Sequence, residues 1–184
     1  MPHSRGMSLL LAWLIVAARP VMALAAAVPT ASPDSSILVI AGPEETGTRL
    51  IVTGRILTRD GARGAPRARV GVYHTDHSGE YGVHPVRRSF PPNRDARLSG
   101  WLVTDSAGRF EVRTIRPGGY PGGGTPAHVH FIVGGHGNYE LRFADDPLIR
   151  RGGASPAEGS RLQVRPVQTD ARGTQHVSVD WRLP

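Results

Sequence analysis

The feature that most constrains the fold is the lack of helical periodicity after residue 30. No stretch of about ten residues there repeats apolar side chains with helical spacing. Short runs rich in β-branched and aromatic residues occur instead, separated by Gly, Pro and Asp, as is typical of strands. We predict strands at residues 50–57, 69–74, 101–104, 110–115, 128–133, 139–143, 162–168 and 175–182. This pattern predicts an all-β fold, an antiparallel β-sandwich of about eight strands with long site-forming loops.

The connections between these runs carry the other structural signals. Residues 105–108, Asp-Ser-Ala-Gly, have the turn chemistry of a hairpin between the flanking strands. The long polar passage 75–100 is interpreted as an excursion over the surface, and loops of this kind often build sites. The glycine-rich segment 118–124 lacks the Lys-Ser/Thr pair and the following helix of a phosphate loop. We therefore interpret it as a wall beside a site.

Residues 1–27 have the features of a secretory signal peptide. Arg5 supplies a basic start, residues 9–18 are apolar, and small residues at 23–27 offer cleavage sites. The apolar run is short for a bilayer span, although an uncleaved anchor remains the alternative. We expect an exported protein, periplasmic or secreted, with an N-terminal lead over 28–48 and one domain over 49–184. No membrane contact is expected after signal removal, because no other segment is apolar enough to span a bilayer.

Composition excludes several kinds of site. The 184 residues contain no cysteine, so thiolate metal ligands, cysteine nucleophiles and disulfides are excluded. The net charge of +7 comes from arginine without lysine, and the arginines are scattered singly or in pairs. A nucleic-acid surface needs basic residues clustered between aromatic platforms. We therefore expect no nucleic-acid partner.

A candidate metal site is formed by two histidines and two tyrosines. His128 and His130 are alternate residues of a predicted strand, so their side chains share one face about 6.6 Å apart along it. Tyr81 and Tyr120 follow glycine turns upstream of this pair. A phenol has a pKa near 10 and binds a metal only when a strong Lewis acid displaces its proton. Two phenolates and two imidazoles suit Fe(III) better than Zn(II) or Cu(I).

Four motifs carry a family resemblance. They occupy residues 72–81 (VYHTDHSGEY), 103–120 (ending in RPGGY), 126–131 (PAHVHF) and 143–147 (FADDP). In the order of these motifs and in their amino-acid sequence, the chain resembles the intradiol ring-cleavage dioxygenases, the catechol and protocatechuate type. The resemblance covers most of the residues after the signal. The resemblance implies a β-sandwich with one mononuclear non-haem Fe(III) per chain. Tyr81, Tyr120, His128 and His130 match the family's ligand positions.

The resemblance also implies an activity. A catechol would bind the iron through both oxygens, and O2 would attack the activated ring to give a muconate-type diacid. The expected partners are thus a small aromatic diol and O2, and a homo-oligomer is left open. In the family the second tyrosine in chain order leaves the metal, so Tyr120 is expected to be labile and Tyr81 to stay.

The chain departs from the family pattern at one position. Catabolic members usually carry an arginine three residues before the first histidine ligand, and this chain has Thr125 there. Arginines elsewhere could supply the charge, and the candidates are Arg94, Arg97, Arg116 and Arg142. The helical N-terminal extension of the catechol-specific branch is also missing, which indicates the smaller, exported members.

Other residues are given structural roles. His74, His77, His84 and His136 are expected at the surface or behind the ligands, and Trp101 and Trp181 in the sandwich core. A function of another class stays open, a non-catalytic exported β-sandwich of transthyretin-like architecture that binds a metal or an aromatic ligand.

Overall fold

The computed structural model describes residues 35–82, 96–134, 136–152 and 161–183. In these ranges it contains ten strands and one short helix, α1 (Pro147–Gly152). The strands are β1 (Ile37–Val39), β2 (Arg49–Leu57), β3 (Arg69–His74), β4 (Leu98–Val103), β5 (Arg109–Ile115), β6 (His128–Val133), β7 (His136–Phe143), β8 (Leu162–Arg165), β9 (Gln168–Thr169) and β10 (Gln175–Arg182). No helix among the described residues has the length and apolarity of a membrane span.

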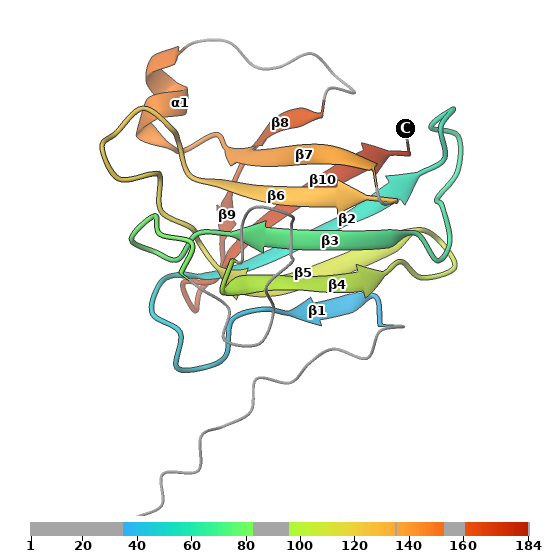
Figure 1. Ribbon diagram of the computed structural model, residues 1–184, viewed down its shortest axis with the longest axis horizontal. Coiled ribbons are helices and arrows are strands. Elements are labelled where there is room, and N and C mark those ends of the chain that lie inside the picture. The colour runs from blue at the N-terminus through green and yellow to red at the C-terminus, as the bar shows by residue number, and fades with distance from the viewer. Residues whose placement is uncertain (1–34, 83–95, 135, 153–160, 184) are drawn as a thin grey trace, which may run out of the picture.

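The strands form two five-stranded sheets that pack face to face (Figure 1). Sheet A has the order β1-β5-β2-β10-β9, and sheet B has the order β4-β3-β6-β7-β8. The strands of sheet A run obliquely behind those of sheet B in Figure 1. The predicted all-β sandwich is therefore confirmed.

The pairing differs from the wholly antiparallel prediction. Three strand pairs are parallel, namely β1 with β5, β2 with β10 and β7 with β8. A period-two pattern predicts that a segment is a strand but carries no information on its direction, which depends on the path of the connections. β2 and β10 lie at opposite ends of the described chain, so no tight turn forces them to be antiparallel.

The predicted hairpin at 105–108 is wrong, although the turn itself forms. Gly108 donates its N–H to the carbonyl of Asp105 at 3.0 Å, and the Asp105 carboxylate accepts the N–H groups of Ala107 and Arg109. β4, however, belongs to sheet B and β5 to sheet A. The turn is therefore an arch between the two sheets, because turn chemistry fixes the local bend and not the sheet that each strand joins.

The core lies between the sheets and is built mainly from alternate residues of the longer strands. Its largest side chains are Trp181, Phe131 and Phe143, each at most 1% exposed. Trp181 fills the core as predicted, but the same prediction for Trp101 is wrong. Leu102, its neighbour on β4, faces inward, so Trp101 lies on the outer face of sheet B, where the Arg69 guanidinium covers its ring at 4.1 Å.

Candidate metal centre

The two candidate histidines lie on the outer face of sheet B, on the side of β6 opposite the core. Val129 and Phe131 of the same strand are fully buried in the sandwich. Although they point outward, His128 and His130 are only 4% and 7% exposed. Their Nε2 atoms approach to 3.0 Å. The start of the strand is fixed by the N–H of Ala127, which donates to the buried carboxylate of Asp146 at 3.0 Å.

The structure brings both candidate tyrosines to this histidine pair. Tyr81 follows β3 and Tyr120 lies between β5 and β6, and the two loops meet at one end of the sandwich (left in Figure 1). The Tyr81 Oη lies 2.5 Å from the Tyr120 Oη, which in turn lies 3.2 Å from the His128 Nε2. All four predicted donor atoms therefore form one continuous series of contacts.

Glycines allow the two tyrosine loops to touch through their backbones. Gly79 has a φ of +90°, and a Cβ there would lie 2.0 Å from the Gly119 carbonyl oxygen. A Cβ on Gly118 would lie 2.6 Å from the Gly79 nitrogen. No larger residue fits at Gly79. The glycine turns before Tyr81 and Tyr120 therefore allow the two loops to pack closely and place the two phenols side by side.

Asp76 organises the Tyr81 loop. Its carboxylate accepts the N–H and hydroxyl of Ser78 at 2.9 and 2.6 Å and the N–H of Glu80 at 3.1 Å. Burial raises the pKa of this carboxyl, but these hydrogen bonds outweigh it and hold the pKa below its ordinary value. The Asp76 carbonyl also accepts the N–H of Gly118 at 2.8 Å. One residue thus links both tyrosine loops.

A salt bridge ties the Tyr81 loop to the segment before β2. The Arg97 guanidinium donates to the Glu45 carboxylate in a bidentate pair at 2.5 and 2.8 Å and lies 3.8 Å from Asp76. These hydrogen bonds lower the pKa of Glu45 and raise that of Arg97. The Arg97 N–H donates to the Tyr81 carbonyl at 2.9 Å. Sequence reasoning missed Glu45, because nothing in the sequence relates it to a loop beyond β3.

The ring orientations of the histidines are also fixed. The Nδ1 of His128 lies 2.8 Å from the Pro126 carbonyl oxygen, an acceptor, so Nδ1 carries the proton and Nε2 presents a lone pair. His130 stacks on Tyr73, with ring centroids 4.5 Å apart and an interplanar angle of 16°. Tyr73 also lies beside Tyr81, with centroids 6.1 Å apart. This third tyrosine of the site was not predicted from the sequence.

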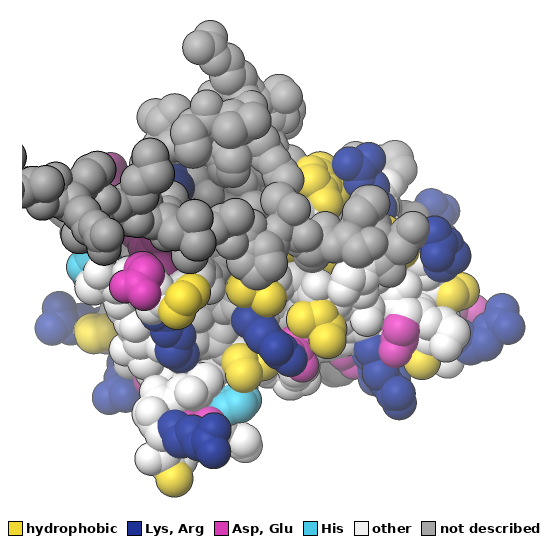
Figure 2. All heavy atoms as spheres, turned by 90° about the horizontal axis from the view of Figure 1, so that it is seen from below, with side chains coloured by type: hydrophobic (Ala, Val, Ile, Leu, Met, Phe, Trp, Pro, Cys, Tyr) yellow, Lys and Arg dark blue, Asp and Glu magenta, His cyan; other side chains and the backbone are white. Residues whose placement is uncertain are grey.

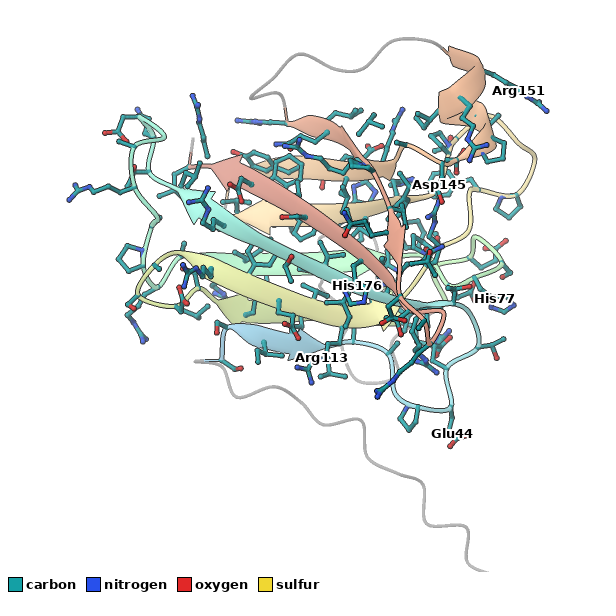
Figure 3. All side chains as sticks on the ribbon, turned by 180° about the vertical axis from the view of Figure 1, so that it is seen from behind. Glu44, His77, Arg113, Asp145, Arg151 and His176 are labelled. Atoms are coloured by element: carbon teal, nitrogen blue, oxygen red, sulfur yellow. The ribbon has the colours of Figure 1, made fainter. Side chains whose placement is uncertain are left out.

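The other histidines have different positions. His74 is fully buried, with Nδ1 2.6 Å from the Thr75 carbonyl and Nε2 2.7 Å from the Thr114 hydroxyl. Burial lowers the pKa of His74 to about 4, so the ring is neutral at physiological pH. His77 is exposed at the end of the sandwich (Figure 3). His84 and the His136 side chain lie outside the described residues.

Glu140 is a further donor that the sequence did not indicate. It lies opposite His130 in the β6–β7 pairing, and its carboxylate and one ring nitrogen from each of His128 and His130 lie within 4.8 Å of one another. Its Oε1 accepts from the Nε of Arg142 at 2.5 Å. The pairing includes an irregularity after Phe131, so counting residues along the sequence would not place Glu140 there.

The spacing of the donors suits a single ion. Imidazole and oxygen ligands bind first-row metals at about 2.0–2.2 Å, so neighbouring ligand atoms lie roughly 3 Å apart. The separations of 3.0 and 3.2 Å at His128 agree with this, and the 2.5 Å between the phenol oxygens requires only a small outward shift. Two ionised phenols and two neutral imidazoles form a hard donor set that fits Fe(III).

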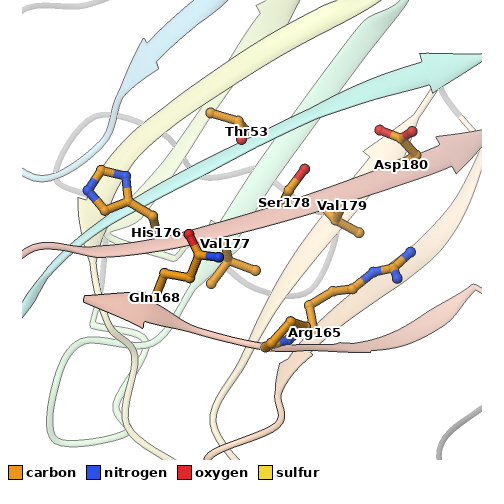
Figure 4. Close-up of a pocket in the computed structure, with 9 residues that line it drawn as sticks. Thr53, Arg165, Gln168, His176, Val177, Ser178, Val179 and Asp180 are labelled. Carbon is orange, nitrogen blue, oxygen red and sulfur yellow. The ribbon is translucent and has the colours of Figure 1, made fainter. Parts of the chain in front are cut away.

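A separate hollow lies on the outer face of sheet A (Figure 4). Its volume is about 460 Å³, and β10 forms its floor with Ser178 and His176. None of the four candidate ligands lines it.

Figure 2 shows one face of the molecule, on which the arginine side chains of the described residues are dispersed among side chains of other types and do not form one patch.

Comparison with known proteins identifies the family. A dioxygenase family model matches residues 26–183. The protocatechuate 3,4-dioxygenase beta chain of Burkholderia cepacia is 33% identical over an alignment of 119 residues, and the match covers 58% of this chain and 49% of that protein. The chain belongs to the intradiol ring-cleavage dioxygenase family.

Other relatives of this intradiol family member agree. Catechol 1,2-dioxygenase of Acinetobacter baylyi is 30% identical over an alignment of 129 residues, and the match covers 58% of this chain and 39% of that protein. The chain therefore spans less than half the length of these two curated relatives. The dioxygenase domain of a dioxygenase and carbohydrate-binding protein fusion from Streptomyces sp. SirexAA-E has a TM-score of 0.58 at 22% identity. That comparison covers 85% of this chain and 94% of that domain, and it shows the shared fold.

Four arginines were expected as substitutes for the arginine that family members usually carry at the position of Thr125 in this chain, and their surroundings differ. Arg97 is held by carboxylates, as described above, and Arg116 pairs with Asp145 at 2.8 Å. Arg142 lies opposite His128 in the β6–β7 pairing and thus on the face of sheet B that carries the candidate site. Arg94 lies outside the described residues.

Proposed function

We propose that the chain is a non-haem Fe(III) intradiol dioxygenase that opens the ring of a catechol-type aromatic with O2 to give a muconate-type diacid. In this proposal, Tyr81, Tyr120, His128 and His130 hold one ferric ion per chain. The observation that carries it is the convergence of two phenol oxygens and two imidazole nitrogens through contacts of 2.5, 3.2 and 3.0 Å. Membership of the family, and relatives named for protocatechuate and catechol, support an aromatic diol as substrate.

Each protein group has a role that follows from its contacts. Bound Fe(III) supplies Lewis acidity, which draws electron density from a chelated catecholate ring and makes the ring reactive toward O2. His128 keeps its Nε2 lone pair available because its Nδ1 proton is held by the Pro126 carbonyl. Tyr120 lies between Tyr81 and His128, so its oxygen, as a phenolate, could accept a hydroxyl proton from a bound diol.

Colour and oxygen uptake test the proposal. Two tyrosinates on Fe(III) should give the iron-loaded protein a visible charge-transfer band that shifts when catechol is added. An oxygen electrode with a small panel of catechols then measures turnover. Tyr81→Phe should weaken the band, because only Tyr120 would then remain as a tyrosinate ligand. Tyr73→Phe, which removes a phenol from the same face but not from the donor series, should keep it.

The outcomes separate the two parts of the proposal. A protein that stays colourless after loading with Fe(III) would contradict both the ferric site and the activity. A catechol-induced shift without oxygen uptake would contradict the activity alone and favour the non-catalytic binding module.

We also propose that the protein is exported, with residues 1–27 removed as a signal peptide. The basic start, the apolar run and the small-residue sites in the sequence support this. N-terminal sequencing of the protein recovered outside the cytoplasm should find a start near residue 28. Unprocessed protein confined to the cytosol would contradict export.

A further inference from the structure

Glu140 stands beside the candidate ferric donors without belonging to them. One of its carboxylate oxygens and one ring nitrogen from each of His128 and His130 lie within 4.8 Å of one another. The side chain is 21% exposed and reaches the site from β7, whereas both tyrosines reach it from loops. Glu140 and the tyrosines therefore approach the shared histidines on different elements.

The phenols and the carboxylate suit ions of different charge. The Tyr81 and Tyr120 hydroxyls share one hydrogen bond at 2.5 Å, in which one phenol donates and the other accepts, so at least one of them keeps its proton in this contact. A trivalent ion is a strong enough Lewis acid to displace phenol protons, whereas a carboxylate carries its charge without a metal. Two imidazoles and one carboxylate, with open positions, are a recognised donor set for Fe(II).

Arg142 orients the Glu140 carboxylate through one of its two oxygens. Its Nε donates to the Oε1 of Glu140 at 2.5 Å, and both side chains are about three-quarters buried, at 26% and 21% exposure. A carboxylate offers two oxygens with about four lone-pair sites, so Oε2 remains able to bind an ion while Oε1 stays on Arg142.

We propose that Glu140 gives this centre a second donor set, in which His128, His130 and Glu140 bind a divalent first-row cation while both tyrosines remain phenols. The inference rests on the proposed function only in that both donor sets include His128 and His130. The donor set therefore depends on the metal charge: tyrosines complete it for Fe(III), and Glu140 completes it for Fe(II), Mn(II), Zn(II) or Co(II).

Cobalt binding to the metal-free full chain tests this. Co(II) reports its ligands through visible d–d bands, and calorimetric titration gives its affinity. Glu140→Gln should weaken Co(II) binding by about 10- to 100-fold and leave the position of the Fe(III)-tyrosinate band unchanged. The double variant Tyr81→Phe with Tyr120→Phe should lose that band and keep Co(II) affinity within about threefold.

A matched control comes from the other sheet. Glu111 accepts from the Nε of Arg113 at 2.6 Å, the same two-residue spacing on a strand as Glu140 and Arg142, but on β5 of sheet A. Glu111→Gln should leave Co(II) affinity and the ferric band unchanged. Equal Co(II) affinity in Glu140→Gln and Glu111→Gln would overturn the proposal.

The unmodified chain provides a second test if Glu140→Gln fails to fold. Co(II) should bind without the ultraviolet difference spectrum of ionised tyrosine. Appearance of that spectrum, or failure to bind Co(II) by a chain that takes up Fe(III) with colour, would overturn the second donor set and leave the proposed function standing. Glu140-dependent Co(II) binding in a chain that develops no ferric colour would support the donor set and contradict the proposed function.

Discussion

Burial of His74 should make the fold sensitive to mild acid. The ring bridges the two sheets, because β3 carries it in sheet B and its Nε2 meets the Thr114 hydroxyl of β5 in sheet A. Burial lowers the pKa from 6.5 to about 4 in the folded chain. The unfolded chain therefore binds a proton between these values that the folded chain does not, and stability must fall as the pH drops through this range.

The size of the effect follows from the shift. Each pKa unit corresponds to about 1.4 kcal/mol, so lowering the pH from about 7 to about 5 should remove about 2 kcal/mol from the free energy of unfolding, and about 3 kcal/mol by about pH 4. Glu45 and Asp76, whose pKa values are lowered, lose their contributions mainly below about pH 4.5. Over the interval from about pH 7 to about pH 5 these two carboxyls therefore contribute little, and a variant without the His74 ring separates His74 from the other histidines.

Urea unfolding of the metal-free chain at these two pH values measures the change. His74→Gln cannot titrate, so its free energy of unfolding should start lower at neutral pH but change by about 2 kcal/mol less over the interval. The same pH dependence in the wild-type chain and in His74→Gln would refute the reasoning, because the acid sensitivity would then arise from other groups.

Three further predictions concern the loops and Tyr120. Gly79→Ala should cost more than about 2 kcal/mol and abolish ferric colour because its methyl group would meet the Gly119 carbonyl, whereas Gly122→Ala, at a similar φ of +94° with no atom nearby, should cost only about 1 kcal/mol and keep the colour. Equal effects would show that backbone strain and not the loop contact matters. Glu45→Gln should lower the free energy of unfolding in urea by about 1 kcal/mol, since Arg97 is partly exposed, and broaden the ferric band by loosening the Tyr81 loop; an unchanged band would exclude this coupling. Tyr120→Phe should reduce oxygen uptake by at least about 100-fold while Tyr73→Phe retains most of it, and comparable losses would argue against a special role for Tyr120.

The parts of the structure that depend on local chemistry were predictable from the sequence. The bounds of β3, β6 and β10 coincide with the predicted strands, because alternating apolar residues and flanking turn residues define them. The structure also brings Tyr81, Tyr120, His128 and His130 together, as the order of the motifs predicted. Their role as iron ligands remains a prediction.

Features that depend on long-range pairing were not predictable. Glu140 reaches His130 only through the β6–β7 register, which contains an irregularity. β1 was not predicted as a strand and pairs in parallel with β5 across a long connection. β4 begins three residues earlier than predicted, and its local sequence does not show that Leu102 rather than Trp101 faces the opposite sheet. In each case the deciding partner is distant in sequence, so local patterns carry no signal for it.

The two faces of β6 tie metal chemistry to correct folding. Alternate residues of this one strand fill the sandwich interior and supply both imidazoles, as Val129 and Phe131 do on one side and His128 and His130 on the other. Sliding the strand by a single residue would bring histidines inside and valine and phenylalanine out, so misregistered molecules could not assemble the centre. If the ferric site forms as proposed, its colour would count only the correctly folded molecules in a preparation, which makes absorbance a direct assay of refolding yield.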